Sequence, residues 1–96
     1  MIDRIEMDVF NYKVLIENDK CVINEMVCIL ENDDIDNIIR IIRNWKYEYR
    51  NNTIIGENHY FINIMSEGKE YVYNFDNEFP DDFKTLVDYI GGIYAR

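Results

Sequence analysis

The sequence has few histidines, cysteines and serines, which include the commonest zinc ligands and catalytic nucleophiles. Its 96 residues include one histidine, His59, and two cysteines, Cys21 and Cys28. A structural zinc site needs four ligands, usually supplied as close pairs such as Cys-x2-Cys. Three scattered candidates are too few, so we predict that the chain binds no metal. If residues 21–31 form a regular strand, the two thiols point to opposite sheet faces and are buried structural side chains.

Motifs for enzymatic chemistry are also missing. The one serine, Ser66, lies in a predicted turn without the Gly-x-Ser-x-Gly setting of a nucleophile. The four glycines form neither a dinucleotide-binding nor a phosphate-binding loop. A small-ligand or enzymatic site at His59 is an alternative that no spacing supports. We therefore expect a protein that is not an enzyme and that needs no cofactor.

Long apolar runs are absent, and residues 1–10 alternate charged and apolar side chains. A membrane span needs about 20 consecutive apolar residues, and a signal peptide needs a continuous apolar stretch. These absences predict a cytoplasmic protein with reduced thiols. A hydrophobic content of 48% argues against disorder, so we expect a single domain over residues 1–96. An amino-acid composition rich in Ile, Asn, Lys and Tyr is typical of proteins encoded by AT-rich bacterial or phage genomes.

Positive charge is scarce, because 10 basic residues face 19 acidic ones and the net charge is −9. Nucleic acids and anionic membranes attract proteins mainly through Lys and Arg, so we expect neither as a partner. An acidic surface suits a basic protein partner, or it serves solubility alone. Four of the ten cations lie together in segment 40–50 and form what we call the basic stripe: Arg40, Arg43, Lys46 and Arg50.

Alternating apolar residues predict extended structure over residues 2–16. The alternation changes phase at Val9–Phe10, which indicates a β-bulge or a break. Asn18-Asp19 is typical of a two-residue hairpin turn, because both residue types tolerate positive φ. Residues 21–31 are then the returning strand, although their apolar residues also fit one face of a helix.

A helix is predicted to follow, beginning at Asn32-Asp33-Asp34 and ending near residues 50–52. Apolar residues recur at three- and four-residue steps and cover one arc: Ile35, Ile38, Ile39, Ile42, Trp45 and Tyr49. The basic stripe covers the neighbouring arc, together with Tyr47. Cations near a helix C-terminus are favoured by the helix dipole without any partner, so the stripe is either a solvated face or a docking surface.

The second half repeats this order without a detectable sequence repeat. Strands at 60–65 and 71–75 flank a turn at residues 66–69, and Tyr60, Tyr71 and Tyr73 lie either on an uncovered sheet face or under the helices. Pro80 at the first turn and the acids around it predict a second helix from Phe79, which Gly91-Gly92 ends. The expected fold is a two-layer α+β domain of order β-β-α-β-β-α. It has a mainly antiparallel four-stranded sheet with both helices on one face.

The leading hypothesis is a small acidic protein-binding module. One form of it is an inhibitor of the immunity or phage anti-defence type, which occludes a basic site on its partner. A homo-oligomeric structural module is the alternative, in which the basic stripe of one copy meets acids of another. Acids near the second helix form what we call the acidic rim: Asp76, Glu78, Asp81 and Asp82. Helix-start acids also serve capping, and this cluster lacks an EF-hand pattern. The candidate partner-binding residues are the acidic rim, the basic stripe and Tyr47.

Overall fold

The computed structural model describes residues 1–53 and 58–96. Within these residues it has seven strands and two helices. The strands are β1 (Ile2–Val9), β2 (Tyr12–Glu17), β3 (Lys20–Ile23), β4 (Met26–Cys28), β5 (Glu48–Arg50), β6 (His59–Ser66) and β7 (Lys69–Asp76). The helices are α1 (Asp34–Ile42) and α2 (Phe83–Tyr94). Neither helix has both the length and the apolar character that crossing a membrane requires.

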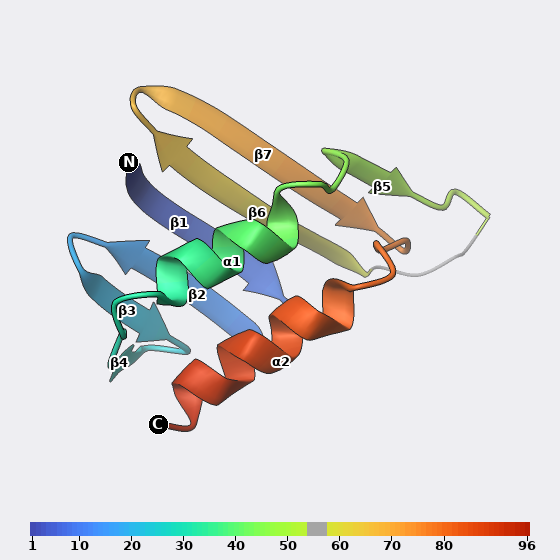
Figure 1. Cartoon of the computed structure of the whole chain (residues 1–96). Coiled ribbons are helices and arrows are strands. Elements are labelled where there is room, and N and C mark those ends of the chain that lie inside the picture. Colours follow the sequence, from blue (N-terminus) through green and yellow to red (C-terminus); the bar gives the residue numbers. More distant parts are fainter. Residues whose placement is uncertain (54–57) are drawn as a thin grey trace.

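All described strands belong to one sheet of order β4-β3-β2-β1-β6-β7-β5. Neighbouring strands are antiparallel except β5 and β7, which run parallel. Both helices lie on the same side of this sheet (Figure 1). The predicted α+β class is confirmed. The predicted four-stranded sheet is wrong, because residues expected as two long strands divide into four short ones and residues 48–50 add an edge strand.

Two-residue turns produce this division. Phe10-Asn11 joins β1 to β2, so the phase change at Val9–Phe10 marks a hairpin and not a bulge in one strand. Asn18-Asp19 forms the predicted turn, with φ of 53° and 62°. Asn24-Glu25 adopts the same conformation, with φ of 51° and 70°, and splits the predicted strand 21–31. Positive φ at both central residues matches the right-handed twist of a hairpin.

This extra turn also corrects the prediction for the cysteines. Cys21 in β3 lies directly opposite Cys28 in β4, so both side chains point to the same sheet face. Both are free thiols, with Cys21 buried and Cys28 half-buried. A regular strand would have separated their faces, but the turn reverses the chain between them.

The core lies between the helices and one face of the sheet. Alternate strand residues face the helices and are buried: Ile5, Met7, Val9, Val14, Ile16, Cys21, Ile23, Ile62, Ile64, Tyr73 and Phe75. The helices contribute Ile38, Ile42, Phe83, Leu86, Ile90 and Ile93. Tyr71 pairs with Ile64 and Tyr60 with Phe75, so the three strand tyrosines lie on the helix side. The opposite face has no described element packed over it (Figure 1).

Helix α1 is shorter than its periodicity predicts. The backbone N–H of Arg43 donates to Ile39, and the N–H of Trp45 then donates to Ile42 in a tighter turn. The Trp45 ring packs against Phe75 and Phe83, with centroids 5.9 and 5.7 Å apart. Residues 48–50 pair with β7 instead of continuing the helix. Tertiary packing and strand pairing therefore override the weak helical propensity of this segment.

Helix α2 differs from its prediction at both ends. It begins at Phe83, because the N–H of Phe83 closes a turn on the Pro80 carbonyl. Gly91 and Gly92 lie inside the helix and do not end it. A Cβ at Gly91 would lie 2.8 Å from the Tyr12 hydroxyl, so this glycine permits close approach of the helix to β2.

Candidate functional site

Three adjoining cavities run along α1 where it meets the sheet, and we call them together the α1 groove. Their volumes are about 270, 660 and 200 Å³. The first two share Met1, Ile2, Asp19 and Ile35, and the last two share Ile2, Ile39 and Arg43. Ile2 lines all three cavities, so they form one continuous depression with apolar side chains at its floor.

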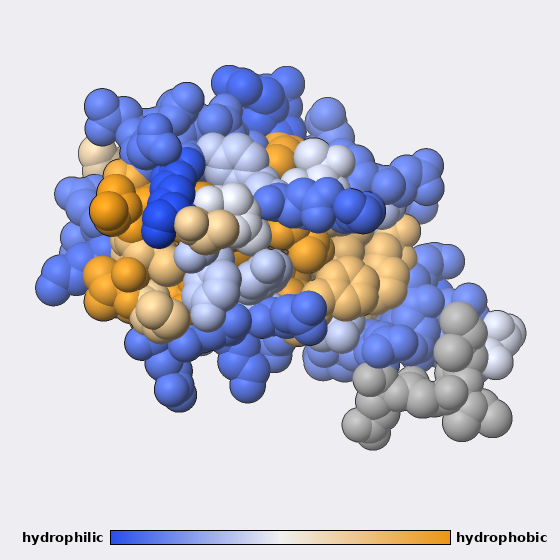
Figure 2. Space-filling model, turned by 90° about the horizontal axis from the view of Figure 1, so that it is seen from below, coloured by the Kyte–Doolittle hydropathy of each residue, from blue (hydrophilic) through white to orange (hydrophobic). Residues whose placement is uncertain are grey.

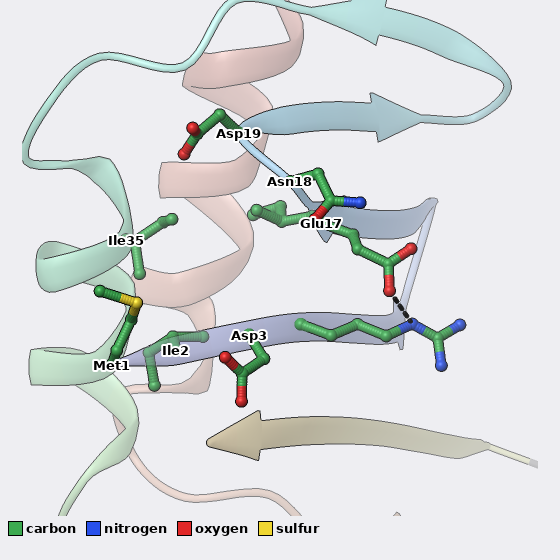
Figure 3. Close-up of a pocket in the computed structure, with 9 residues that line it drawn as sticks. Met1, Ile2, Asp3, Glu17, Asn18, Asp19 and Ile35 are labelled. Atoms are coloured by element: carbon green, nitrogen blue, oxygen red, sulfur yellow. Dashed lines mark ion pairs between the residues drawn. The ribbon is translucent and has the colours of Figure 1, made fainter. Parts of the chain in front are cut away.

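One end of the α1 groove is acidic. Asp3, Glu17 and Asp19 come from β1, β2 and the turn after β2, and all three line this end. The Glu17 side chain points away from Ile35 towards Arg4 (Figure 3). Glu17 is held by an ion pair with Arg4 at 3.8 Å, and Asp3 accepts the backbone N–H of Glu67 at 2.9 Å. The Asp19 side chain reaches from its turn towards α1 (Figure 3). This end can receive a cation whose aliphatic stem lies on the apolar floor.

The middle of the α1 groove has mixed charge. Asp36, Arg40 and Arg43 lie three and four residues apart on one side of α1 and line the largest cavity with Asp19. Arg40 donates to the Asn37 side-chain oxygen at 3.2 Å, and both arginines are exposed. Their guanidinium groups can form bidentate hydrogen bonds with carboxylates.

The other end of the α1 groove is aromatic. Tyr47, Tyr71 and Tyr73 line it with Ile39 and Ile64. The Tyr47 and Tyr73 rings lie 4.9 Å apart. Burial, and next the nearby Tyr47, raise the pKa of the Tyr73 hydroxyl. This tyrosine is therefore a neutral hydrogen-bonding group at neutral pH. Charge and polarity thus change stepwise along the groove.

The structure separates the residues of the basic stripe. Arg40, Arg43 and Tyr47 line the α1 groove. Lys46 lies beyond the end of α1, and Arg50 belongs to β5, so the predicted arrangement of four cations on one helix is wrong. The helix ends before it can align them. The role of these residues in partner binding stays a prediction.

The acidic rim is partly used within the protein. Asp76 contacts the His59 imidazole and pairs with Arg50 at 3.4 Å. The hydrogen bond with His59 is the main cause that lowers the pKa of the Asp76 carboxyl, and Arg50 adds to it. Asp82 accepts the Trp45 indole N–H at 2.7 Å. Glu78 and Asp81 are exposed. The rim and the stripe therefore meet at Arg50–Asp76, where each neutralises the other.

A buried carboxylate fixes α1 beside α2. Asp34 is 1% exposed, and it accepts hydrogen bonds from Arg96 at 2.9 Å, the Tyr89 hydroxyl at 2.7 Å and the Glu31 N–H at 2.7 Å. The hydrogen bonds with Arg96 are the main cause that holds the pKa of Asp34 far below its usual range, against the effect of burial. The sequence predicted Asp34 only as a first-turn acid of the helix.

The acidic end of the α1 groove was not predicted, because strand pairing brings its residues together. Asp3 and Glu17 are distant in sequence, and the β1–β2 hairpin places Arg4 opposite Glu17. Reading residues 2–16 as one strand hid this pairing. The change in alternation at Val9–Phe10 was the signal in the sequence that could have revealed this site. Interpreted as a hairpin at Phe10-Asn11, it places Asn18-Asp19 beside the start of β1.

The described residues offer no metal centre: among residues 1–53 and 58–96, no group of three or more His, Cys, Asp or Glu side chains is placed to hold an ion. No protein-family model, curated protein or solved structure matches this chain.

Proposed function

We propose that this domain is a small non-catalytic protein-binding module that takes a basic segment of its partner into the α1 groove. The observation that carries this proposal is a group of carboxylates beside apolar side chains in adjoining cavities: Asp3, Asp19 and Asp36 beside Ile2 and Ile35. Asp19 and Asp36 are exposed and line the same cavity. Asp36 belongs to the first turn of α1, whereas Arg40 and Arg43 line this cavity from the last turn and the C-cap of the helix. A Lys or Arg side chain fits this site by pairing its head and burying its stem.

The net charge of −9 supports the same partner. An acidic protein attracts a basic one over long range, which raises the association rate more than the final affinity. Binding would cover the basic surface of the partner and block whatever that surface contacts. An inhibitor of the immunity or phage anti-defence kind would work in this way.

Selection of peptides from a random displayed library tests the proposal without a known partner. We expect the peptides that bind the native protein to be enriched in Lys and Arg. The association rate of a selected peptide should fall about tenfold at low salt for the double variant Asp19→Asn with Asp36→Asn. Asparagine keeps the positive φ that Asp19 adopts, so the turn should survive.

The matched control is Glu70→Gln with Asp88→Asn, which removes the same charge at exposed positions outside both the α1 groove and the acidic rim. This control should change the association rate much less. An equal effect of both double variants would show that only net charge matters. Selected peptides without basic residues would contradict the proposal.

A further inference from the structure

Strand β4 forms one edge of the sheet and presents apolar side chains to solvent. The exposed fractions are 59% for Met26, 81% for Val27 and 72% for Ile29. The Tyr94 hydroxyl of α2 lies 3.7 Å from the Met26 sulfur and extends this surface onto the helix. Hydrophobic surface gathers at the end of the molecule where β4 and the C-terminal end of α2 lie (Figure 2).

The two sheet edges differ in their protection. Proteins usually guard an edge strand with charge or proline, because its unpaired N–H and C=O groups can pair with another strand. Strand β5 carries Glu48 and Arg50, and Arg50 pairs with both Glu48 and Asp76. Residues 26–30 contain no charged residue and no proline. Strand β4 therefore lacks the protection that β5 has.

Backbone geometry identifies the residue that faces outward. A two-residue turn closes on a hydrogen-bonded pair, here Ile23 and Met26. Pairs alternate in an antiparallel ladder, so Val27 lies opposite Val22 without hydrogen bonds to it. The N–H and C=O of Val27 then point away from β3. Beyond Cys28, the Ile29 carbonyl accepts a hydrogen bond from Arg96 at 3.0 Å.

An apolar row leads to the same residue. Leu15, Val22 and Val27 lie opposite one another on successive strands, on the sheet face away from the helices. The first two are half-buried, and the row ends at the exposed Val27. A second strand beside Val27 would cover the end of this row.

We propose that two copies of this chain associate through antiparallel pairing of β4, centred on Val27, to form one continuous sheet. In a two-fold symmetric pair, the residue at the axis meets the same residue of the other copy. A charged residue there would face a like charge, so the centre of the interface should be uncharged and apolar. In this register Val27 meets Val27, and Met26 meets Cys28. Pairing centred on Cys28 would oppose Glu25 to Glu31, and like charges there would repel.

The charge of the chain favours this surface over others for self-association. Two copies of charge −9 repel wherever their acidic surfaces approach. Residues 26–30 carry no charge, so two copies that meet there bring no like charges of this segment together. The proposal does not depend on the α1 groove, which β4 does not line.

Sedimentation equilibrium over a range of protein concentrations tests the proposal. We expect the native mass to rise from 11.6 kDa towards twice that value. The variant Val27→Lys should remain monomeric at concentrations where the native protein is mostly dimer. The added lysine lowers the net negative charge of each copy and so weakens the repulsion between copies. A loss of dimerisation in this variant could therefore not be explained by increased repulsion between the net charges. The control Asn52→Lys adds the same charge far from β4 and should dimerise like the native protein.

Cross-linking checks the register. A hydrogen-bonded antiparallel pair has Cα atoms about 5.5 Å apart, within the range for a disulfide. Val27→Cys should therefore give a covalent dimer on mild oxidation. Glu48→Cys, on the other edge, should not. Cys21 should not compete, because burial raises the pKa of its thiol to about 11. A native protein that stays monomeric, a Val27→Lys variant that still dimerises, or equal cross-linking of both cysteine variants would overturn the proposal.

Discussion

At the residue scale, Asp34 joins elements that are far apart in the sequence. Its carboxylate lies at the start of α1 and binds Tyr89 and Arg96, within and just beyond α2. A buried charge is tolerated only when paired and hydrogen-bonded, and Asp34 meets both conditions. Removing one partner of a buried pair leaves the other unpaired, so the free-energy cost exceeds the net value of the pair.

The variant Asp34→Asn should reduce the free energy of unfolding by about 2–3 kcal/mol at neutral pH, because Arg96 would lose its charged partner. This value lies below the roughly 3–5 kcal/mol typical of a fully buried pair, since the Arg96 side chain is 28% exposed. Urea denaturation measures the change. Asp36→Asn is the control, because Asp36 is exposed on the same helix and should cost much less. Equal costs for the two variants would contradict the assigned role.

The same pair predicts how stability depends on pH. The folded protein holds the pKa of Asp34 below the value near 3.9 that an unfolded Asp has. The carboxylate therefore stabilises the fold above about pH 4, and this contribution is lost progressively as the pH falls below that value. Asp34→Asn should flatten the acid limb of the stability profile. A profile with unchanged slope would argue against the pair.

At the element scale, the two neighbouring glycines of α2 have different roles. Gly91 faces Tyr12, whereas a Cβ at Gly92 would have no atom within 4 Å. Glycine in a helix interior costs roughly 0.5–1 kcal/mol relative to alanine. The sequence favoured the interpretation of this pair as a stop signal, because paired glycines commonly end helices. Packing against β2 explains one glycine, and nothing in the structure explains the other.

Gly92→Ala should therefore raise the free energy of unfolding by about 0.5–1 kcal/mol in thermal or urea denaturation. Gly91→Ala should raise it less or lower it, because the new methyl group would meet the Tyr12 hydroxyl at 2.8 Å. Adding Tyr12→Phe removes that oxygen and leaves a 3.5 Å contact with the ring. Gly91→Ala should become more favourable in that background. Equal effects in both backgrounds would show that the close approach does not matter.

At the scale of the whole molecule, charge is unevenly distributed. Cations pair with acids at several places, as Arg4 does with Glu17 and Arg50 with Asp76. Carboxylates of β1, of the turn after β2 and of α1 nevertheless line the α1 groove: Asp3, Asp19 and Asp36. Like charges held together destabilise a compact state, and salt weakens their repulsion.

The free energy of unfolding should therefore rise when sodium chloride increases from about 0.05 M to about 1 M. At about 1 M the Debye length is only about 3 Å, so exposed charges farther apart than that hardly repel one another. Denaturation by urea, which carries no charge, measures the shift in midpoint. The double variant Asp19→Asn with Asp36→Asn should show a smaller rise, because part of the repulsion is already removed. Should salt lower the midpoint instead, ion pairs and not repulsion would dominate the electrostatics of this fold.

Short-range patterns determined several features of this protein without help from the rest of the chain. The steps between Ile35, Ile38, Ile39 and Ile42 placed α1, and Asn18-Asp19 placed a hairpin turn. The strands at 60–65 and 71–75 were also found, with their turn between them. These features depend on side-chain periodicity and on positive φ at single residues, which act over a few positions.

Tertiary structure decided the rest. The end of α1 depends on the packing of Trp45 against Phe75, and β5 depends on pairing with β7. The acidic end of the α1 groove and the Asp34–Arg96 pair join residues that lie far apart in the sequence. Local periodicity carries no information about such contacts. They form because burial and strand pairing outweigh the small differences in local propensity that the sequence expresses.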